Sequence, residues 1–333
     1  MEPGKKIIDQ DIARITARID KNEFCSSSVF VAGGTGLIGR TLVPVFKALG
    51  AKVILLVRSE DQARKLFGND CVYYVGTIQD IPKIDEDIDY IVHMANPTSS
   101  FFFVHNPVET MQIAIQGTKN ILELAKNKQV RSMVYLSSME VYGYPQKGHS
   151  VKENEVSGFD TRMSRNSYPI SKLTCEMMCA AYVHEYSVPA KVIRLTQTFG
   201  AGVKYDDGRV FGELMRCAIE KKDIVLHTTG ETERCYLYTA DAVAAILVVL
   251  ADGTNGDVYN AANPETYCSI RQMAELVAKI GQISVQYEID DIQRGYASTL
   301  YSMLDTSKLS RLGWKPETGL REMFERMIAS QND

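Results

Sequence analysis

The hydrophobic pattern of the first half of the chain alternates between short apolar runs and segments with helical periodicity. The apolar runs predict strands at residues 29–31, 53–57, 71–75, 90–93 and 133–136. The periodic segments predict helices at residues 40–49, 61–67, 108–127 and 168–186. Strands and helices that alternate at this spacing form a parallel sheet with right-handed crossovers and helices on its faces. The pattern therefore predicts an α/β fold built on a doubly wound parallel sheet.

The segment between the first two strands contains a glycine-rich turn, GGTGLIG at residues 33–39. In a strand–turn–helix unit, Gly33 permits the tight turn, Gly36 lets the backbone approach a pyrophosphate, and Gly39 lets helix and strand pack closely. The helix N-terminus then offers free N–H groups and a partial positive charge to the phosphates. The turn therefore predicts a dinucleotide-binding site. Its remaining contacts are expected at the carboxyl ends of the strands.

Residues 1–25 precede the first strand and lie outside this nucleotide-binding unit. Ile8, Ile12, Ile15 and Ile19 recur at helical spacing, with charged residues between them. The pattern predicts an amphipathic helix that lies on the body of the protein. The alternative is an arm that binds a partner, and in neither case is a catalytic role expected.

Composition narrows the class of protein. The 333 residues carry a formal net charge of -4, which argues against a nucleic-acid-binding surface. The seven cysteines are an odd number without a CxxC pair, which fits free thiols in a reducing cytosol. The most apolar run, residues 242–251, is about half the length needed to span a bilayer. We expect a soluble cytoplasmic protein that binds neither nucleic acid nor membrane and holds no metal.

The candidate chemistry lies in SYPISK, where Tyr168 and Lys172 stand four residues apart on one face of a predicted helix. A lysine ammonium beside a phenol favours the phenolate and lowers a pKa that starts near about 10. Tyr168 is then suited to act as a general base on an alcohol or as an acid on a ketone. Ser138, at the end of a predicted strand, is expected to hydrogen-bond the same oxygen. The three side chains are the predicted catalytic groups.

With these motifs, the chain from about residue 28 to the C-terminus resembles the nucleotide-sugar epimerase/dehydratase family of extended short-chain dehydrogenase/reductases. The turn matches that family's GxxGxxG, and the other resemblances are HMANP at 93–97, SSMEVYG at 137–143, SYPISK at 167–172, RLTQTFG at 194–200 and LDTSKLSRLGWKP at 304–316. The resemblance implies a Rossmann-like sheet with a smaller C-terminal α/β substrate lobe. It also implies that Ser138, Tyr168 and Lys172 are catalytic. The implied cofactor contacts are Gly33, Thr35, Gly36, Leu37, Ile38, Gly39, Arg58, Thr77, Ile78, Ala95, Tyr168 and Lys172.

Within the family, DDGRVF at residues 206–211 and ERCYLYTADAV at 233–243 resemble UDP-glucuronate decarboxylases most closely. The resemblance implies a nucleotide-diphosphate sugar as substrate, and implies contacts from Asn96, Gln197, Arg209 and Arg234. The sequence departs from the family pattern at Ala114 and Gln197, where asparagine is usual, and at Thr77, where aspartate is usual.

Two residues of SSMEVYG bear on the reaction. Met139 stands where 4,6-dehydratases usually carry an acid, which disfavours dehydration. Glu140 favours decarboxylation, or another reaction that needs a carboxylate near the sugar ring, and is expected to be catalytic. Epimerisation remains open, because it needs only rotation of a keto-sugar formed with Tyr168 as base.

The second strand gives a conflicting indication about the cofactor. An acidic residue at its end would bind the adenosine ribose and mark NAD, but Val57 stands there and Arg58 follows. Arg64 and Lys65 would add positive charge near a 2′-phosphate. The pattern favours NADP(H), with NAD as the alternative. The decarboxylase or epimerase therefore has one enzymatic alternative, an NADPH-dependent keto-sugar reductase. A non-enzymatic nucleotide-binding sensor or scaffold is a further alternative.

The resemblance further implies a homodimer formed through the helices at 108–127 and 168–186, with Met177, Met178, Ala181 and Tyr182 on the apolar face. The expected division of the chain has three parts. They are an N-terminal helical arm at 1–27, a dinucleotide-binding domain at 28–195 plus about 237–260, and a substrate-binding lobe at about 196–236 and 261–333.

Overall fold

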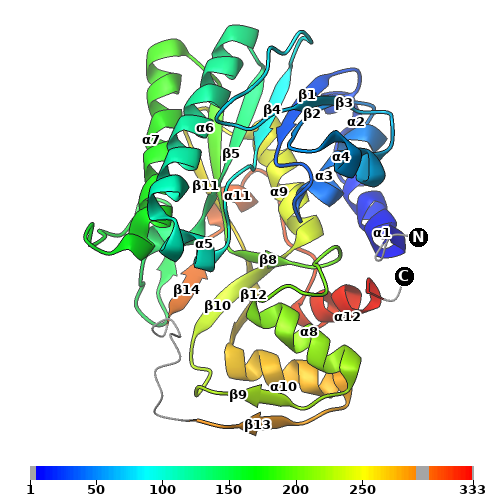
Figure 1. The fold of residues 1–333 in the computed structure, drawn as a ribbon, viewed down its shortest axis with the longest axis vertical. Coiled ribbons are helices and arrows are strands. Elements are labelled where there is room, and N and C mark those ends of the chain that lie inside the picture. The colour runs from blue at the N-terminus through cyan, green and yellow to red at the C-terminus, as the bar shows by residue number, and fades with distance from the viewer. Residues whose placement is uncertain (1–4, 290–299, 332–333) are drawn as a thin grey trace.

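The computed structural model describes residues 5–289 and 300–331, in which a large parallel sheet stands above a smaller lobe (Figure 1). The sheet has seven strands in the order β11-β7-β5-β4-β1-β2-β3, and every neighbouring pair runs parallel. Its strands are β1 (Ser28–Ala32), β2 (Lys52–Val57), β3 (Val72–Val75), β4 (Tyr90–His93), β5 (Ser132–Ser138), β7 (Ala190–Leu195) and β11 (Val258–Ala261). The predicted Rossmann-like fold class is confirmed.

Alternating residues of the sheet enter two different cores, as expected for a parallel sheet covered on both faces. In β1, Val29 and Val31 pack on the side of α3 (Gly39–Ala48) and α9 (Thr239–Asp252). Phe30 and Ala32 pack on the opposite side, against α6 (Pro107–Lys128) and α7 (Ser167–Tyr186). Figure 1 shows the two helix layers on either side of the sheet.

Most predicted elements are present, and their bounds differ by one or two residues. The strand predicted at 133–136 extends to Ser138, and the helix predicted at 108–127 begins at Pro107. The short helix α5 (Ser100–His105) was not predicted, because six residues with three consecutive phenylalanines show no helical period. The other elements of this part of the chain are α2 (Lys21–Phe24), α4 (Glu60–Phe67), η1 (Met139–Tyr142), β6 (Ser150–Val151) and η2 (Ser164–Asn166).

The smaller lobe contains a five-stranded mixed sheet in the order β12-β10-β14-β6, with β8 also paired to β10. A two-stranded sheet of β9 and β13 lies apart from it. After β7, the chain also forms β8 (Gln197–Phe199), α8 (Val210–Glu220), β9 (Ile224–Leu226), β10 (Glu233–Tyr238), β12 (Asn263–Ser269), α10 (Ile270–Gly281), β13 (Val285–Tyr287), β14 (Tyr301–Leu304), α11 (Ser307–Ser310) and α12 (Leu320–Ala329).

One hydrophobic core runs from the large sheet into the smaller lobe, because it includes Val31 of β1 as well as Phe199, Phe211 and Phe324. Phe199 stacks on Phe211 with ring centroids 4.7 Å apart and tilts against Phe324 at 5.0 Å. We propose that the domain division given above separates cofactor binding from substrate binding, although both parts share this core. In this division β11 is a strand of the large sheet and α9 packs on that sheet. α9 is apolar, but among the described residues no helix has both the length and the hydropathy to cross a membrane.

The N-terminal segment forms α1 (Lys5–Thr16), which packs on α3 and α9. Ile15 is buried and Ile12 packs on the same core, while Ile19 packs there from beyond the end of the helix. The amphipathic pattern thus produced a helix on the body of the protein, beside the C-terminal helix α12 (Figure 1).

Candidate active site

The glycine turn between β1 and α3 has the geometry that a pyrophosphate site needs. Gly33 has φ +92°, and a Cβ there would lie 2.8 Å from the Ala95 nitrogen, so the turn can lie against the end of β4 only with glycine. A Cβ at Gly39 would lie 2.1 Å from the Gly34 oxygen. The first turn of α3 has neither a side-chain cap nor an acidic residue. Its N–H groups and positive dipole end therefore suit the phosphates of NAD(P).

The other expected cofactor contacts follow the carboxyl ends of neighbouring strands. Arg58 is exposed directly after β2, and Thr77 and Ile78 follow β3 in the loop that begins at Gly76. Thr77 is exposed, whereas Ile78 is buried against Gly117 of α6. Because β3, β2, β1 and β4 are adjacent in the sheet, these residues lie along one edge.

Arg64, expected to add charge near a 2′-phosphate, makes contacts of its own in the structure. Arg64 hydrogen-bonds Glu60 through Nε at 2.7 Å and Asn69 through Nη1 at 2.8 Å, and its guanidinium lies over the Tyr73 ring at 4.7 Å. These contacts keep it on the surface of α4, so positive charge at the end of β2 comes from Arg58. Lys65 is exposed.

Tyr168 and Lys172, both on α7, lie buried at the end of β5. The Lys172 ammonium donates to the Leu136 carbonyl at 2.6 Å and lies over the rings of Tyr135 at 4.7 Å and Tyr168 at 5.8 Å. Ser138 ends β5, and its hydroxyl accepts a bond from the Glu140 N–H at 3.2 Å. The structure thus brings the three predicted catalytic residues together.

The expected lowering of the Tyr168 pKa is not observed. Burial and the negative charge of Glu140 hold the pKa of this phenol above its usual value, although a hydrogen bond with Ser138 and the charge of Arg165 act in the opposite direction. Burial lowers the pKa of Lys172 to about 8. The neighbouring charge alone would lower the pKa of Tyr168, but desolvation is the larger effect when both groups are buried.

An aromatic ring that the sequence did not predict at the site covers Tyr168, the predicted base. The Phe103 ring of α5 is buried and stacks on the Tyr168 ring with centroids 4.1 Å apart and planes 11° apart. The Arg165 guanidinium lies over Phe103 at 5.2 Å and donates to Glu140 at 2.7 Å. The aromatic run at residues 101–103 was the available signal, but only the fold brings it to Tyr168. Phe103 keeps water from one face of the phenol, and Arg165 orients Glu140.

The expected substrate contacts are only partly assembled. Arg234 of β10 donates to Gln197 of β8 at 3.2 Å, and its buried Nε has no partner among the described residues. The side-chain amide of Asn96 is buried and likewise without a partner in the part of the chain that the structure describes. Buried polar atoms normally have hydrogen-bond partners, so these atoms suit a polar ligand. Arg209 instead forms a two-point pair with Asp207 and lies over Phe211 at 4.6 Å.

The departures from the family pattern have structural counterparts. Met139 is buried, and its sulfur accepts a bond from the Thr196 hydroxyl at 3.3 Å, so it packs within the smaller lobe. At Ala114 the backbone carbonyl accepts from the buried Cys175 thiol at 3.3 Å. Alanine provides no side-chain amide at this position of α6.

The fold and the site together define a dinucleotide-dependent enzyme with a tyrosine–lysine pair. The model of the NAD dependent epimerase/dehydratase family matches residues 29–262, and the chain belongs to this family. The expectation of an enzyme of the extended short-chain dehydrogenase/reductase type is thus confirmed. A UDP-glucuronic acid decarboxylase 1 of Arabidopsis thaliana is 28% identical over 311 residues, which cover 90% of this chain and 69% of that protein.

Solved structures share the fold at lower identity. UDP-glucose 4-epimerase of Thermotoga maritima with UDP-glucose has a TM-score of 0.79 at 22% identity, covering 91% of this chain and 98% of that one. RMD of Pseudomonas aeruginosa in complex with NADPH has a TM-score of 0.76 at 23% identity, covering 92% and 99%. At these identities the likeness establishes the fold and leaves the reaction open.

The buried Lys172 ammonium makes stability depend on pH in a defined direction. The pKa of Lys172 is about 8 in the folded chain and 10.5 ordinarily, so between these values the unfolded chain binds more protons. The unfolding free energy of the wild type, relative to Lys172→Met, should therefore rise by about 3 kcal/mol from pH 7 to pH 11. Urea unfolding at a series of pH values measures this difference, and a difference independent of pH would contradict the buried charge.

Proposed function

We propose that this protein oxidises a hydroxyl of a nucleotide-diphosphate hexuronate and decarboxylates the resulting keto-sugar. The observation that carries the proposal is Glu140, bonded to Arg165 at 2.7 Å and close enough to raise the pKa of Tyr168 by its charge. The buried Met139 provides no acid for dehydration. The similarity to UDP-glucuronic acid decarboxylases over 90% of the chain supports a UDP-linked uronic acid as the substrate.

The first step requires a base and a hydride acceptor. Tyr168 takes the proton of the sugar hydroxyl as the carbon–oxygen double bond forms, and Ser138 hydrogen-bonds the same oxygen. NAD(P), when bound, supplies the hydride acceptor, and its oxidised ring carries a positive charge that favours the phenolate. The ammonium of Lys172, held by the Leu136 carbonyl, adds positive charge below the phenol.

The second step follows from the position of the new ketone. A ketone β to the carboxylate lets the carbon–carbon bond break, so that CO2 leaves and the electron pair remains as an enolate. A proton added to the enolate carbon and return of the hydride complete the reaction without net redox change. We assign to Glu140 the transfer of a proton from water to the enolate carbon, and the binding of carboxylate or phosphate oxygens to Arg234 together with Gln197 and Asn96.

One observation favours a second candidate, an NADPH-dependent reductase of a keto-sugar. Arg58 is exposed at the end of β2, where an acidic side chain would bind the ribose of NAD. Tyr168, with its raised pKa, is then the proton donor to the ketone. The two candidates share the base and differ in whether the hydride returns to the same sugar.

Loss of the phenol should abolish turnover while the fold remains intact. With UDP-glucuronate and either NADP or NAD, the wild type should release CO2 and a product 44 Da lighter, measured by mass spectrometry. Tyr168→Phe should reduce this rate about a hundred- to ten-thousandfold, because general acid–base catalysis is typically worth that much. Tyr144→Phe, at an exposed tyrosine, is the matched control. Wild-type turnover in Tyr168→Phe would rule out the assigned base, and a wild type inert toward UDP-glucuronate would rule out the decarboxylase.

Cofactor choice rests on Arg58. A charge-assisted bond to a 2′-phosphate is worth roughly 1.5 to 3 kcal/mol, so Arg58→Ala should weaken NADP about ten- to more than a hundredfold and NAD little. Titration of both cofactors against both proteins measures the effect. Arg64→Ala is the control, because Arg64 is held against Tyr73. Equal losses for the two cofactors would indicate stacking of Arg58 on adenine and would remove the reason to prefer NADP.

We also propose a homodimer formed through α6 and α7, which pack on each other and expose Val108, Met111 and Met177. Of the residues expected on this face, Met177 is 67% exposed, whereas the Tyr182 hydroxyl donates to Glu123 at 2.6 Å. Light scattering at micromolar concentration should give twice the chain mass, and Met177→Glu should give the monomer because a charge is costly in an apolar interface. Met163→Glu, at an exposed loop position, is the control. A monomeric wild type would refute the dimer.

A further inference from the structure

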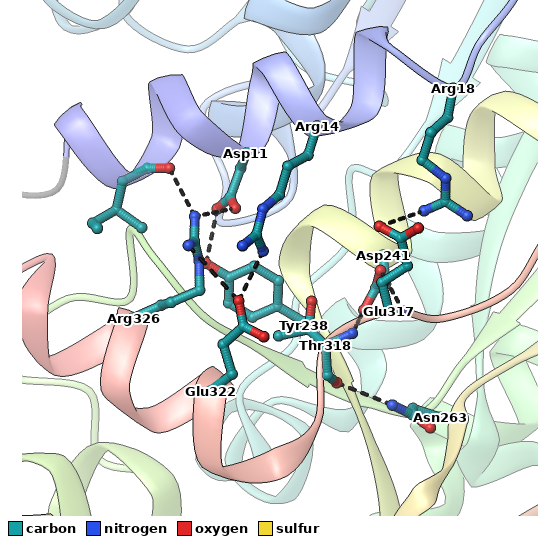
Figure 2. Close-up of polar contacts among 11 residues, drawn as sticks. Asp11, Arg14, Arg18, Tyr238, Asp241, Asn263, Glu317, Thr318, Glu322 and Arg326 are labelled. Atoms are coloured by element: carbon teal, nitrogen blue, oxygen red, sulfur yellow. Dashed lines mark hydrogen bonds and ion pairs between the residues drawn. The ribbon is translucent and has the colours of Figure 1, made fainter.

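Three buried polar side chains from distant parts of the sequence meet beneath the N-terminal helix (Figure 2). The Tyr238 hydroxyl donates to Asp11 Oδ2 at 2.8 Å, and Arg326 Nη2 donates to Asp11 Oδ1 at 2.7 Å. Arg326 Nε also donates to the Tyr238 oxygen at 3.1 Å. These contacts join α1, the end of β10 and α12 into one closed triangle.

The triangle is buried, unlike the ion pairs that Arg14 and Arg18 form in the N-terminal segment. The exposed fractions are 1% for Asp11, 0% for Tyr238 and 9% for Arg326. Arg14 pairs with Glu322 at 2.8 Å and Arg18 with Glu317 at 3.0 Å, but these pairs are solvent-accessible and weak by comparison. Removing one member of a buried group leaves the others desolvated without partners, so the triangle holds its three elements in one arrangement.

The position of Tyr238 connects the triangle to the expected substrate contacts. Tyr238 ends β10, the strand that carries Arg234, and it pairs with Phe199 of β8. Gln197, the partner of Arg234, pairs with Tyr236 in the same register. Two paired strands thus connect Tyr238 physically to the Arg234–Gln197 contact.

α1 also approaches the loop that follows β8. A Cβ added at Gly202 would lie 3.7 Å from Ile8 and 3.8 Å from Leu37 of the glycine turn. Gln331 donates to the Val203 carbonyl at 2.9 Å from beyond the end of α12. The loop is thus enclosed by α1, the glycine turn and the C-terminal segment, where the two lobes meet.

We propose that α1 is part of the substrate-binding architecture, with Asp11 as a positioning residue for the substrate lobe. Asp11 acts through Tyr238 on β10 and so sets the place of Arg234 and Gln197. The segment lies outside residues 29–262 that match the family. The assignment to a UDP-linked substrate rests on the function proposed above.

The only tryptophan of the sequence, Trp314, can report on the contact between α1 and α12 without any activity assay. It is 1% exposed, and its indole N–H donates to the Asp241 carbonyl at 3.1 Å. The Asp241 carboxylate in turn accepts from the N–H groups of Glu317 and Thr318, just before α12 (Figure 2). Release of α12 from α1 should therefore expose Trp314 to a quencher.

The experiment compares the wild type with Asp11→Asn and Tyr238→Phe, and uses Arg14→Gln as the control at an exposed pair of the same helix. UDP and NAD affinities are measured by calorimetry, and Trp314 access by acrylamide quenching. Both variants should bind UDP about tenfold more weakly, a size usual for coupling between linked sites, with unchanged NAD affinity and greater quenching. The control should match the wild type.

A purely structural role gives a different result. If the variants unfold at a lower temperature but keep wild-type UDP affinity and quenching, the positioning role is overturned. If the wild type does not bind UDP, the proposed function fails. Quenching alone then decides whether Asp11 keeps α1 and α12 in contact. Unchanged quenching in Asp11→Asn would in that case overturn the inference.

Discussion

Burial of the large sheet on both faces is the constraint on which the rest of the structure depends. With α3 and α9 on one face and α6 and α7 on the other, only the edge at the carboxyl ends of the strands is left for a ligand. The glycine turn, Arg58 and Ile78 follow strands that end at this edge, and Ser138 is the last residue of such a strand. The smaller lobe shares this core, and the proposed cofactor and substrate contacts, Arg58 and Arg234 among them, come from the two sides of it.

Electrostatics at the site follow from the same burial. Lys172 and Tyr168 lie where water is excluded, so burial shifts both pKa values toward the uncharged forms. Burial and the charge of Lys172 lower the pKa of the neighbouring His93 to about 3, which keeps the imidazole neutral. The charges of Glu140 and Arg165 act on the buried phenol in opposite directions, the first raising and the second lowering the pKa of Tyr168.

Local patterns predicted the parts of the fold that depend on local physics. The strand at residues 53–57 and the helix at 168–186 follow from apolar runs and helical spacing, and the turn from the conformational demand on Gly33. Tyr168 and Lys172 were found because a helix places residues four apart on one face. α5 and the packing of Phe103 on Tyr168 were not found, since no short-range pattern records which distant ring a side chain will meet.

The sequence by itself thus determined the class of fold, the pyrophosphate turn and the tyrosine–lysine pair, because each depends on residues within about one helix or one turn of another. Tertiary structure alone decided the surroundings of these groups. It brought Arg165 to Glu140, placed the Arg64 guanidinium over Tyr73, and joined Asp11 to Tyr238 and Arg326 across the whole chain. The physical reason is that burial and desolvation depend on every element packed around a group, and these elements come from all parts of the sequence.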